Sequence, residues 1–285
     1  MIRRLIAGII MVGTLTNCNA QESSIFLIEN HIPFGVAYVK LTPDQVANYE
    51  MVIVEPDFYT ENEIAALKAA GPKILTYVTL GEVDPNRWYY SLLEGKGFLG
   101  KNPNWNSSYI NLEDEQIRRI MLNRVLPEIM AKNPDGLFLD TIDAVSPVTK
   151  RGHLKPFMVE LIKEIREKYP ESVIIQNAGL FLIEDTKEHV DAFLSEALVS
   201  DYDFASRTYR VRQEEEIEQR LDYLYHYAKL SNKPFFIVEF AKSDDQREEI
   251  SGKLDSLGFP YFITNIGLSQ LPIDPGPVTN DLNQE

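Results

Sequence analysis

The sequence predicts an α/β protein that folds as one (β/α)8 barrel. Eight short runs of apolar and β-branched residues recur along the chain, and helical patterns lie between most of them. Eight strands that alternate with helices are the content of a TIM barrel, whose parallel strands are covered by helices. The length of 285 residues also suits a single domain of this kind better than two domains of average size.

The expected strands are runs with little polar alternation, which is typical of strands buried on both faces. In chain order they cover residues 34–41, 51–55, 73–80, 136–140, 172–177, 192–196, 235–240 and 260–265. The run at 136–140 is the clearest, because it is apolar until it stops on a carboxylate.

The expected helices show apolar residues at three- and four-residue spacing. They cover residues 61–70, 113–130, 154–169, 214–230 and 244–257. Turn residues agree with this phasing, because Gly71 and Gly258 follow helices and precede a proline by one or two positions. Residues 81–112 are rich in aromatic, glycine and asparagine residues, and we expect a long loop there on the face where barrels bind substrates.

The first twenty residues are expected to be an export signal rather than part of the barrel. A basic start with Arg3 and Arg4 precedes an apolar stretch, residues 5–15, that is too short to span a bilayer. Cys18 follows that stretch as in a lipoprotein acylation site, and cleavage after Ala20 is the alternative. The sequence thus predicts an exported protein, either anchored to a bacterial membrane through Cys18 or periplasmic or secreted. The expected segments are 1–20 signal, 21–33 join, 34–271 barrel and 272–285 exposed tail.

The chain is strongly acidic, with a net charge of −15 at pH 7, and loss of Arg3 and Arg4 with the signal would make it more negative. Long-range repulsion argues against nucleic acid as a partner, while a cationic polymer would be attracted; solubility is the simpler explanation of the charge. Cys18 is the only cysteine, so no disulfide or thiol nucleophile is expected. The four histidines lack metal-ligand spacing, and neither a metal nor a cofactor is expected.

Polar side chains occur at the carboxyl end of nearly every expected strand, where barrels carry their chemistry. They are Tyr38, Glu55, Glu82, Asp140, Asp143, Asn177, Glu196, Glu239 and Asn265. Buried acids are costly without partners, so a whole ring of them is hard to explain by packing. The sequence therefore predicts an acidic cleft at this end of the barrel.

Asp140 and Glu196 are expected to be the catalytic pair, because they end the fourth and sixth strands and can face each other across the barrel mouth. Cleavage of a glycosidic bond needs one protonated carboxyl for the leaving oxygen and one ionised carboxylate that attacks or directs water. Asp143 is the alternative nucleophile, or it orients Asp140 and binds a substrate hydroxyl or amine.

Four segments at the strand ends carry a family resemblance. They are Tyr77-Val78-Thr79-Leu80-Gly81-Glu82 with Arg87 and Trp88-Tyr89-Tyr90 after it, Gly136 to Asp143, Gln176-Asn177-Ala178-Gly179, and Ser195-Glu196-Ala197-Leu198. In these segments the chain resembles glycoside hydrolase family 114, the endo-α-1,4-polygalactosaminidases. The resemblance implies a (β/α)8 fold, export and hydrolysis of a galactosamine-containing exopolysaccharide, and it matches Asp140 and Glu196 to the aspartate and glutamate of the family's fourth and sixth strands.

We therefore expect an exported, lipid-anchored glycosidase that cleaves within a chain of α-1,4-linked galactosamine or a related cationic amino sugar. Its acidic cleft would attract such a polymer by steering and by direct pairing. Substrate contacts are expected from Tyr38, Tyr77, Glu82, Arg87, Asp143, Asn177, Glu239 and Asn265. Two alternatives stay open, namely a non-catalytic carbohydrate-binding lipoprotein and a glycosidase for a different glycan.

Overall fold

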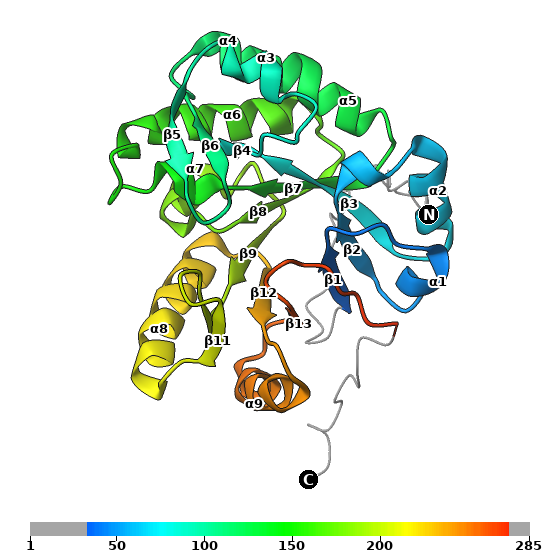
Figure 1. The fold of residues 1–285 in the computed structure, drawn as a ribbon, viewed down its shortest axis with the longest axis vertical. Coiled ribbons are helices and arrows are strands. Elements are labelled where there is room, and N and C mark those ends of the chain that lie inside the picture. Colours follow the sequence, from blue (N-terminus) through cyan, green and yellow to red (C-terminus); the bar gives the residue numbers. More distant parts are fainter. Residues whose placement is uncertain (1–32, 274–285) are drawn as a thin grey trace, which may run out of the picture.

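The computed structural model describes residues 33–273, and eight parallel strands form a nearly closed barrel (Figure 1). Their order is β1-β2-β3-β7-β8-β9-β12-β13, so each barrel strand pairs with the next one along the chain. The strands are β1 (Phe34–Ala37), β2 (Met51–Val54), β3 (Lys73–Thr79), β7 (Gly136–Asp140), β8 (Val173–Asn177), β9 (Ala192–Glu196), β12 (Phe235–Phe240) and β13 (Tyr261–Thr264). Each begins within one residue of its predicted start, which confirms the fold class.

The two ends of this sheet, β1 and β13, meet beside each other. The backbone amide of Tyr38, which follows β1, donates to the carbonyl of Leu268 at 2.7 Å. The buried ring of Phe34 packs against Phe236 and Phe262, with ring centroids 4.9 and 6.1 Å away. Packing and this hydrogen bond therefore close the barrel where the strand ladder is missing.

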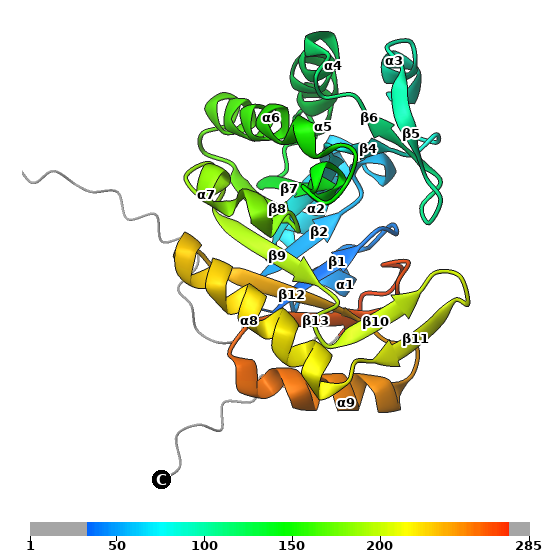
Figure 2. The ribbon, with the colours of Figure 1, turned by 90° about the vertical axis from the view of Figure 1, so that its left-hand side faces the viewer.

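Helices cover the outside of the barrel (Figure 2). They are α1 (Pro43–Val46), α2 (Glu61–Ala69), α4 (Glu115–Ile120), α5 (Leu126–Met130), α6 (Lys155–Lys168), α7 (Ile183–Thr186), α8 (Glu214–Ser231) and α9 (Asp244–Leu254). Short 3-10 turns lie at Pro56–Phe58, Ile142–Val145, Gly152–Leu154, Leu180–Leu182 and Asp255–Leu257. Within residues 33–273, no helix combines the length and apolarity needed to cross a bilayer.

Local sequence explains the helices that were predicted. In α6, Met158, Leu161, Ile162 and Ile165 are buried at the spacing of one helical face. The helix predicted at 113–130 is α4 and α5 joined by a π-helical turn, Met121–Val125. Pro127 has no amide hydrogen for the regular hydrogen-bond pattern, which accounts for the wider turn directly before it.

The expectation of a loop at residues 81–112 is wrong in part, because this segment has secondary structure of its own. It forms a three-stranded antiparallel sheet, ordered β4-β6-β5, and one short helix. The elements are β4 (Glu82–Val83), α3 (Tyr90–Glu94), β5 (Phe98–Asn102) and β6 (Ser107–Ile110). The pairing of β5 with β6 shifts register between Phe98 and Lys101, and such an irregularity hides strand alternation in the sequence.

A second insertion, after β9, was not predicted. Residues of β10 (Ser200–Asp203) and β11 (Thr208–Val211) form an antiparallel hairpin. The two insertions follow the carboxyl ends of β3 and β9, and Figure 2 shows the tip of the hairpin and the turn between β5 and β6 on the same side of the barrel. They therefore extend the walls of the barrel mouth.

Candidate active site

Asp140, Asn177 and Glu196 are the last residues of three consecutive barrel strands, β7, β8 and β9. The side-chain nitrogen Nδ2 of Asn177 donates to Asp140 Oδ1 at 2.7 Å and to Glu196 Oε1 at 2.8 Å. The two carboxylate oxygens are therefore at most about 5.5 Å apart, the sum of these distances of 2.7 and 2.8 Å. The structure thus brings the two expected catalytic acids together and places an amide between them.

The backbone turns sharply directly after each of these three residues. Thr141, Ala178 and Ala197 have φ angles of 59, 54 and 54°, in the left-handed region that non-glycine residues rarely adopt. Such a conformation costs on the order of 1 kcal/mol or more per residue, and it persists where the surroundings impose it. A residue in the left-handed conformation therefore follows the last residue of β7, β8 and β9.

Thr141 also ties the end of β7 to the end of β3. Its hydroxyl oxygen accepts hydrogen bonds from the amides of Leu80, Gly81 and Glu82 at 3.2, 2.8 and 3.2 Å. A Cβ atom on Gly81 would lie 2.3 Å from the Thr141 carbonyl oxygen, so only glycine allows this approach. The contact fixes the chain that continues into β4.

Burial raises the pKa of both catalytic candidates. Desolvation and then the charge of Asp140 raise the pKa of Glu196 to about 7, while the hydrogen bond from Asn177 lowers it. Desolvation also raises the pKa of Asp140, but hydrogen bonds from Asn177 and Tyr77 and the charge of Arg87 act in the opposite direction. Burial therefore disfavours ionisation of both carboxyl groups, and the negative charge of Asp140 adds to this effect at Glu196.

Two tyrosines line the pair on the side of β1 and β3. The rings of Tyr38 and Tyr77 pack edge to face, with centroids 5.0 Å apart. Desolvation, followed by the charge of Asp140, raises the pKa of both phenols well above its usual value. Both hydroxyls therefore keep their protons and can act as donors beside the Asp140 carboxylate.

Arg87 packs against one of these two tyrosines. Its guanidinium is 5.0 Å from the centre of the Tyr77 ring, within the range of a cation–π contact. It also pairs with Glu55 and, at 3.1 Å, with Asp57. With a side chain only 16% exposed, Arg87 is placed to act on Asp140 through the field that it creates rather than from the open cleft.

Asp143 lies three residues beyond Asp140 in a 3-10 turn, and its side chain is exposed. Partial desolvation and the charges of Asp140 and Glu82 raise its pKa to about 6. It adds a third carboxyl group to the mouth. Its exposure suits contact with a substrate amine or hydroxyl better than the role of nucleophile.

Three residues that were expected to contact substrate have hydrogen-bond partners within the fold. Glu82 is buried and accepts from Asn102 Nδ2 at 3.1 Å and from the hydroxyl of Ser107, so it holds the insertion sheet together. The Asn265 side chain bonds Ser269 within a turn after β13. The sequence shows their position at strand ends, but it does not show these partners.

Glu239 is the third, and its side chain is 0% exposed. Its carboxylate accepts hydrogen bonds from the amides of Val199 and Ser200 at 2.8 and 2.7 Å and from the Ser200 hydroxyl at 2.5 Å. A fully enclosed carboxylate cannot contact a polysaccharide. Glu239 therefore anchors the start of the β10–β11 hairpin, in contrast to the substrate contact expected from the sequence.

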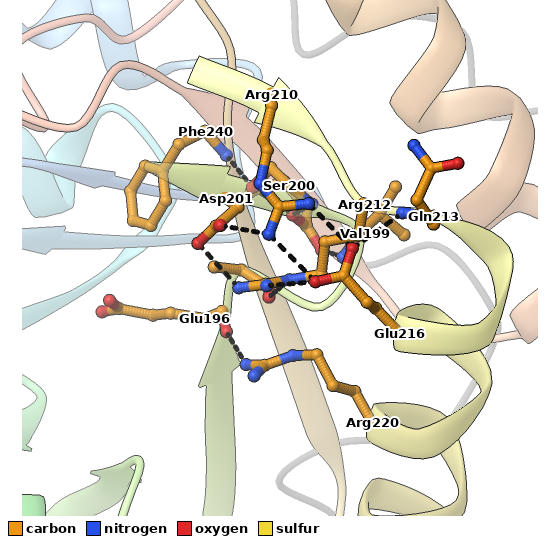
Figure 3. Close-up of polar contacts among 12 residues, drawn as sticks. Glu196, Val199, Ser200, Asp201, Arg210, Arg212, Gln213, Glu216, Arg220 and Phe240 are labelled. Carbon is orange, nitrogen blue, oxygen red and sulfur yellow. Dashed lines mark hydrogen bonds and ion pairs between the residues drawn. The ribbon is translucent and has the colours of Figure 1, made fainter. Parts of the chain in front are cut away.

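An ion network continues this anchor, and sequence reasoning missed it. Asp201 pairs with Arg210 at 2.7 Å and with Arg212 at 3.0 Å, and Arg210 pairs with Glu216 of α8 at 2.7 Å (Figure 3). Beside it, Arg220 donates to the backbone carbonyl of Glu196 at 3.2 Å. Figure 3 shows the Glu196 carboxylate pointing away from this network, so Arg220 contacts the backbone of Glu196 and leaves its carboxylate free of the network.

Within residues 33–273, no group of three or more histidine, cysteine, aspartate or glutamate side chains is arranged to hold a metal ion. The arrangement that does exist is a pair of close carboxyl groups at the carboxyl ends of barrel strands. Such a pair on this fold defines an acid–base hydrolase of the glycosidase type.

The chain belongs to glycoside hydrolase family GH114, whose family model matches residues 21–276. An uncharacterised protein of Methanocaldococcus jannaschii is 27% identical to it, over 85% of this chain and 79% of that protein. An uncharacterised protein of Deinococcus radiodurans is 26% identical, over 79% of this chain and 77% of that protein.

Two solved structures share the fold. The glycoside hydrolase domain of PelA from Pseudomonas aeruginosa has a TM-score of 0.74 at 19% identity, with 84% of this chain and 96% of that domain covered. Ega3 of Aspergillus fumigatus, in complex with galactosamine, has a TM-score of 0.63 at 15% identity, with 83% and 91% covered. At these identities the likeness supports the barrel architecture.

Replacing the bridging amide should change the titration of the pair. In Asn177→Ala both carboxyl groups lose a hydrogen bond that favours their ionised forms, so the pKa of each should rise. Asp143→Asn should act in the opposite direction on Glu196, because it removes a negative charge that raises its pKa from the side of the cleft. Carbon-detected NMR titration of the side-chain carboxyls measures both effects, and an unchanged Glu196 pKa in both variants contradicts this account.

Proposed function

We propose that this glycoside hydrolase cleaves galactosamine-containing polysaccharide within the chain, through a covalent sugar intermediate on Asp140. The observation that carries the proposal is the single amide of Asn177 between two carboxylate oxygens, which limits their separation to about 5.5 Å. Glycosidases that retain anomeric configuration place their carboxyl groups about 5–5.5 Å apart, while inverting ones need roughly 6.5–9.5 Å to hold a water molecule between them.

In the first step the ionised Asp140 carboxylate attacks the anomeric carbon. The bond from that carbon to the leaving oxygen breaks, and Glu196 gives its proton to this oxygen as the aglycone departs. The pKa of about 7 at Glu196 provides the protonated acid near neutral pH. The hydrogen bonds and charge that favour ionisation of Asp140 provide the nucleophile.

In the second step Glu196, now ionised, takes a proton from a water molecule. The water oxygen attacks the anomeric carbon, the bond to Asp140 breaks, and the sugar leaves with its original configuration. Asn177 can stabilise the negative charge on either carboxylate in turn, because its amide donates to both. Tyr38 and Tyr77, which keep their phenolic protons, would donate to substrate oxygens beside Asp140.

The substrate class is supported by charge and by a structural neighbour. Three carboxyl groups, Asp140, Asp143 and Glu196, gather at the barrel mouth, and the whole chain carries −15 at pH 7. A galactosamine unit with a free amino group is cationic near neutral pH and would be attracted by this field. Ega3, which shares the fold, was crystallised with galactosamine.

The roles of the two acids are tested by isosteric substitution. Asp140→Asn and Glu196→Gln should each lower kcat by at least ~100-fold, the scale expected for a positioned acid or base, with little change in folding. Asp222→Asn on the exposed surface of α8 is the matched control and should leave the rate unchanged. Hydrolysis of polygalactosamine followed by mass spectrometry measures the effect. If both site variants keep more than about a tenth of the rate, the assignment fails.

The stereochemical course is tested separately. Proton NMR of the first products from an α-linked chain should show the α-anomer before mutarotation, because two displacements restore the configuration. The inactive variant Glu196→Gln supplies the baseline spectrum. Initial release of the β-anomer would contradict the retaining mechanism even where hydrolysis itself is observed.

We also propose that the protein is exported and anchored through Cys18, which lies outside the described residues. The support is the basic start, the short apolar stretch and the position of Cys18 shortly after it. Cells grown with labelled palmitate should incorporate label into the wild type and none into Cys18→Ser. A soluble wild-type protein that begins at Gln21 would instead favour cleavage after Ala20.

A further inference from the structure

A cavity of about 290 Å³ lies at the rim of the barrel mouth, apart from the residues of the catalytic pair. It is lined by Pro103, Asn104, Trp105, Tyr202, Phe204, Arg207 and Ile266. These residues come from the β5–β6 turn, the β10–β11 hairpin and the segment after β13. All three segments follow carboxyl ends of barrel strands, so the cavity opens on the same face as Asp140 and Glu196.

Aromatic side chains from two insertions meet there. The Trp105 ring packs edge to face against Phe204 with centroids 5.0 Å apart, and Phe204 packs in the same way against Tyr202. Trp105 is nevertheless 50% exposed, which is unusual for so large an apolar side chain. An aromatic face that stays open beside a cavity of this size is suited to stacking on the apolar face of a sugar ring.

The charge at this cavity is opposite to the charge at the catalytic pair. Its one ionisable group with a permanent charge is Arg207, which forms no ion pair with any carboxylate in residues 33–273. Asp203, in the same hairpin turn, accepts hydrogen bonds from the Ala205 amide and the Ser206 hydroxyl at 2.8 Å each and is not part of the lining. A guanidinium repels a sugar ammonium group, but it can donate to the carbonyl oxygen of an acetamido group.

We infer that this cavity is a sugar-binding subsite that takes an N-acetylated amino sugar unit, while the catalytic pair takes the cationic unit. The inference rests on the proposed function, because it concerns the same polymer. It makes the enzyme selective for a partly acetylated chain. The cavity supplies the two elements that an acetylated unit needs, a ring-stacking surface and a hydrogen-bond donor, and it has no carboxylate for an amine.

The hairpin holds this subsite at a fixed place relative to the cut bond. Its first strand is anchored through Ser200 to the buried Glu239, and its ion network reaches α8. Arg212 also donates to the carbonyl of Ala197, the residue after Glu196, at 3.3 Å. The position of acetylated units should therefore correlate with the position of cleavage.

The test compares two polygalactosamine samples of matched length, one fully deacetylated and one about half acetylated. The full-length wild type should show a higher kcat/KM on the partly acetylated polymer. Trp105→Ala should lower kcat/KM about tenfold on the partly acetylated polymer, which is the scale of a good aromatic contact. It should change kcat/KM little on the fully deacetylated polymer. Arg207→Glu should reverse the preference, because a carboxylate replaces the guanidinium.

Matched controls separate local from general effects. Tyr223 on α8 is 49% exposed, almost as much as Trp105, and Tyr223→Ala should leave both rates unchanged. Arg119→Glu on α4 makes the same change of net charge away from the cavity, at a side chain 69% exposed, and should not alter the preference. Equal losses on both polymers in the Trp105 variant, or an unchanged preference in the Arg207 variant, would overturn the subsite.

A binding measurement keeps this test separate from the proposed function. Saturation-transfer NMR on Glu196→Gln with an N-acetylgalactosamine oligosaccharide should show strong transfer to the acetyl methyl protons, and Trp105→Ala should abolish it. If the wild type cleaves neither polymer, the proposed function is contradicted. Saturation transfer to the acetyl methyl protons would still show whether the cavity binds the acetylated sugar. If the wild type cleaves both polymers but shows no transfer to the methyl protons, the subsite is contradicted and the proposed function is not.

Discussion

Two carboxyl groups that share one amide donor set the electrostatics of the whole cleft. Asp140 and Glu196 are both desolvated, and their charges oppose each other, so a second negative charge on the pair is unfavourable. The two hydrogen bonds from the Asn177 Nδ2 group offset part of this electrostatic cost. The other end of the amide, the buried oxygen Oδ1, has no hydrogen-bond partner among the described residues. Such an unsatisfied atom is tolerated where the other end of the side chain is needed.

The barrel makes this arrangement possible through its fixed strand spacing. Neighbouring parallel strands lie about 4.8 Å apart, so β7 and β9 are separated by about twice that distance with β8 between them. Side chains at the ends of β7 and β9 meet only if they lean over β8, and the residue that ends β8 is the one that can bridge them. The left-handed residues Thr141, Ala178 and Ala197 redirect the chain directly afterwards.

Sequence reasoning could predict the barrel and the convergence of Asp140 and Glu196 because these depend on local signals. The run that ends at Asp140 is apolar on both faces and needs no partner to be recognised. The roles of Glu239 and Asn265 depend on groups that lie 40 and 4 residues away in the sequence, and these groups reach them only in the folded chain. The β10–β11 hairpin was missed because polar residues interrupt both of its strands, so neither forms an apolar run, although Tyr209 and Val211 do alternate with exposed residues.

The surroundings also make the two acids unequal, which is what a two-carboxylate mechanism requires. Asp140 has Tyr77 and the positive charge of Arg87 on its side, and both favour its ionised form. Glu196 has a cation nearby too, but Arg220 binds its backbone carbonyl and not its carboxylate. The charges of Asp143 and Glu239 further disfavour ionisation of Glu196. The cations of the fold therefore favour ionisation of Asp140 more than that of Glu196, and this asymmetry comes from the residues around the pair rather than from the pair itself.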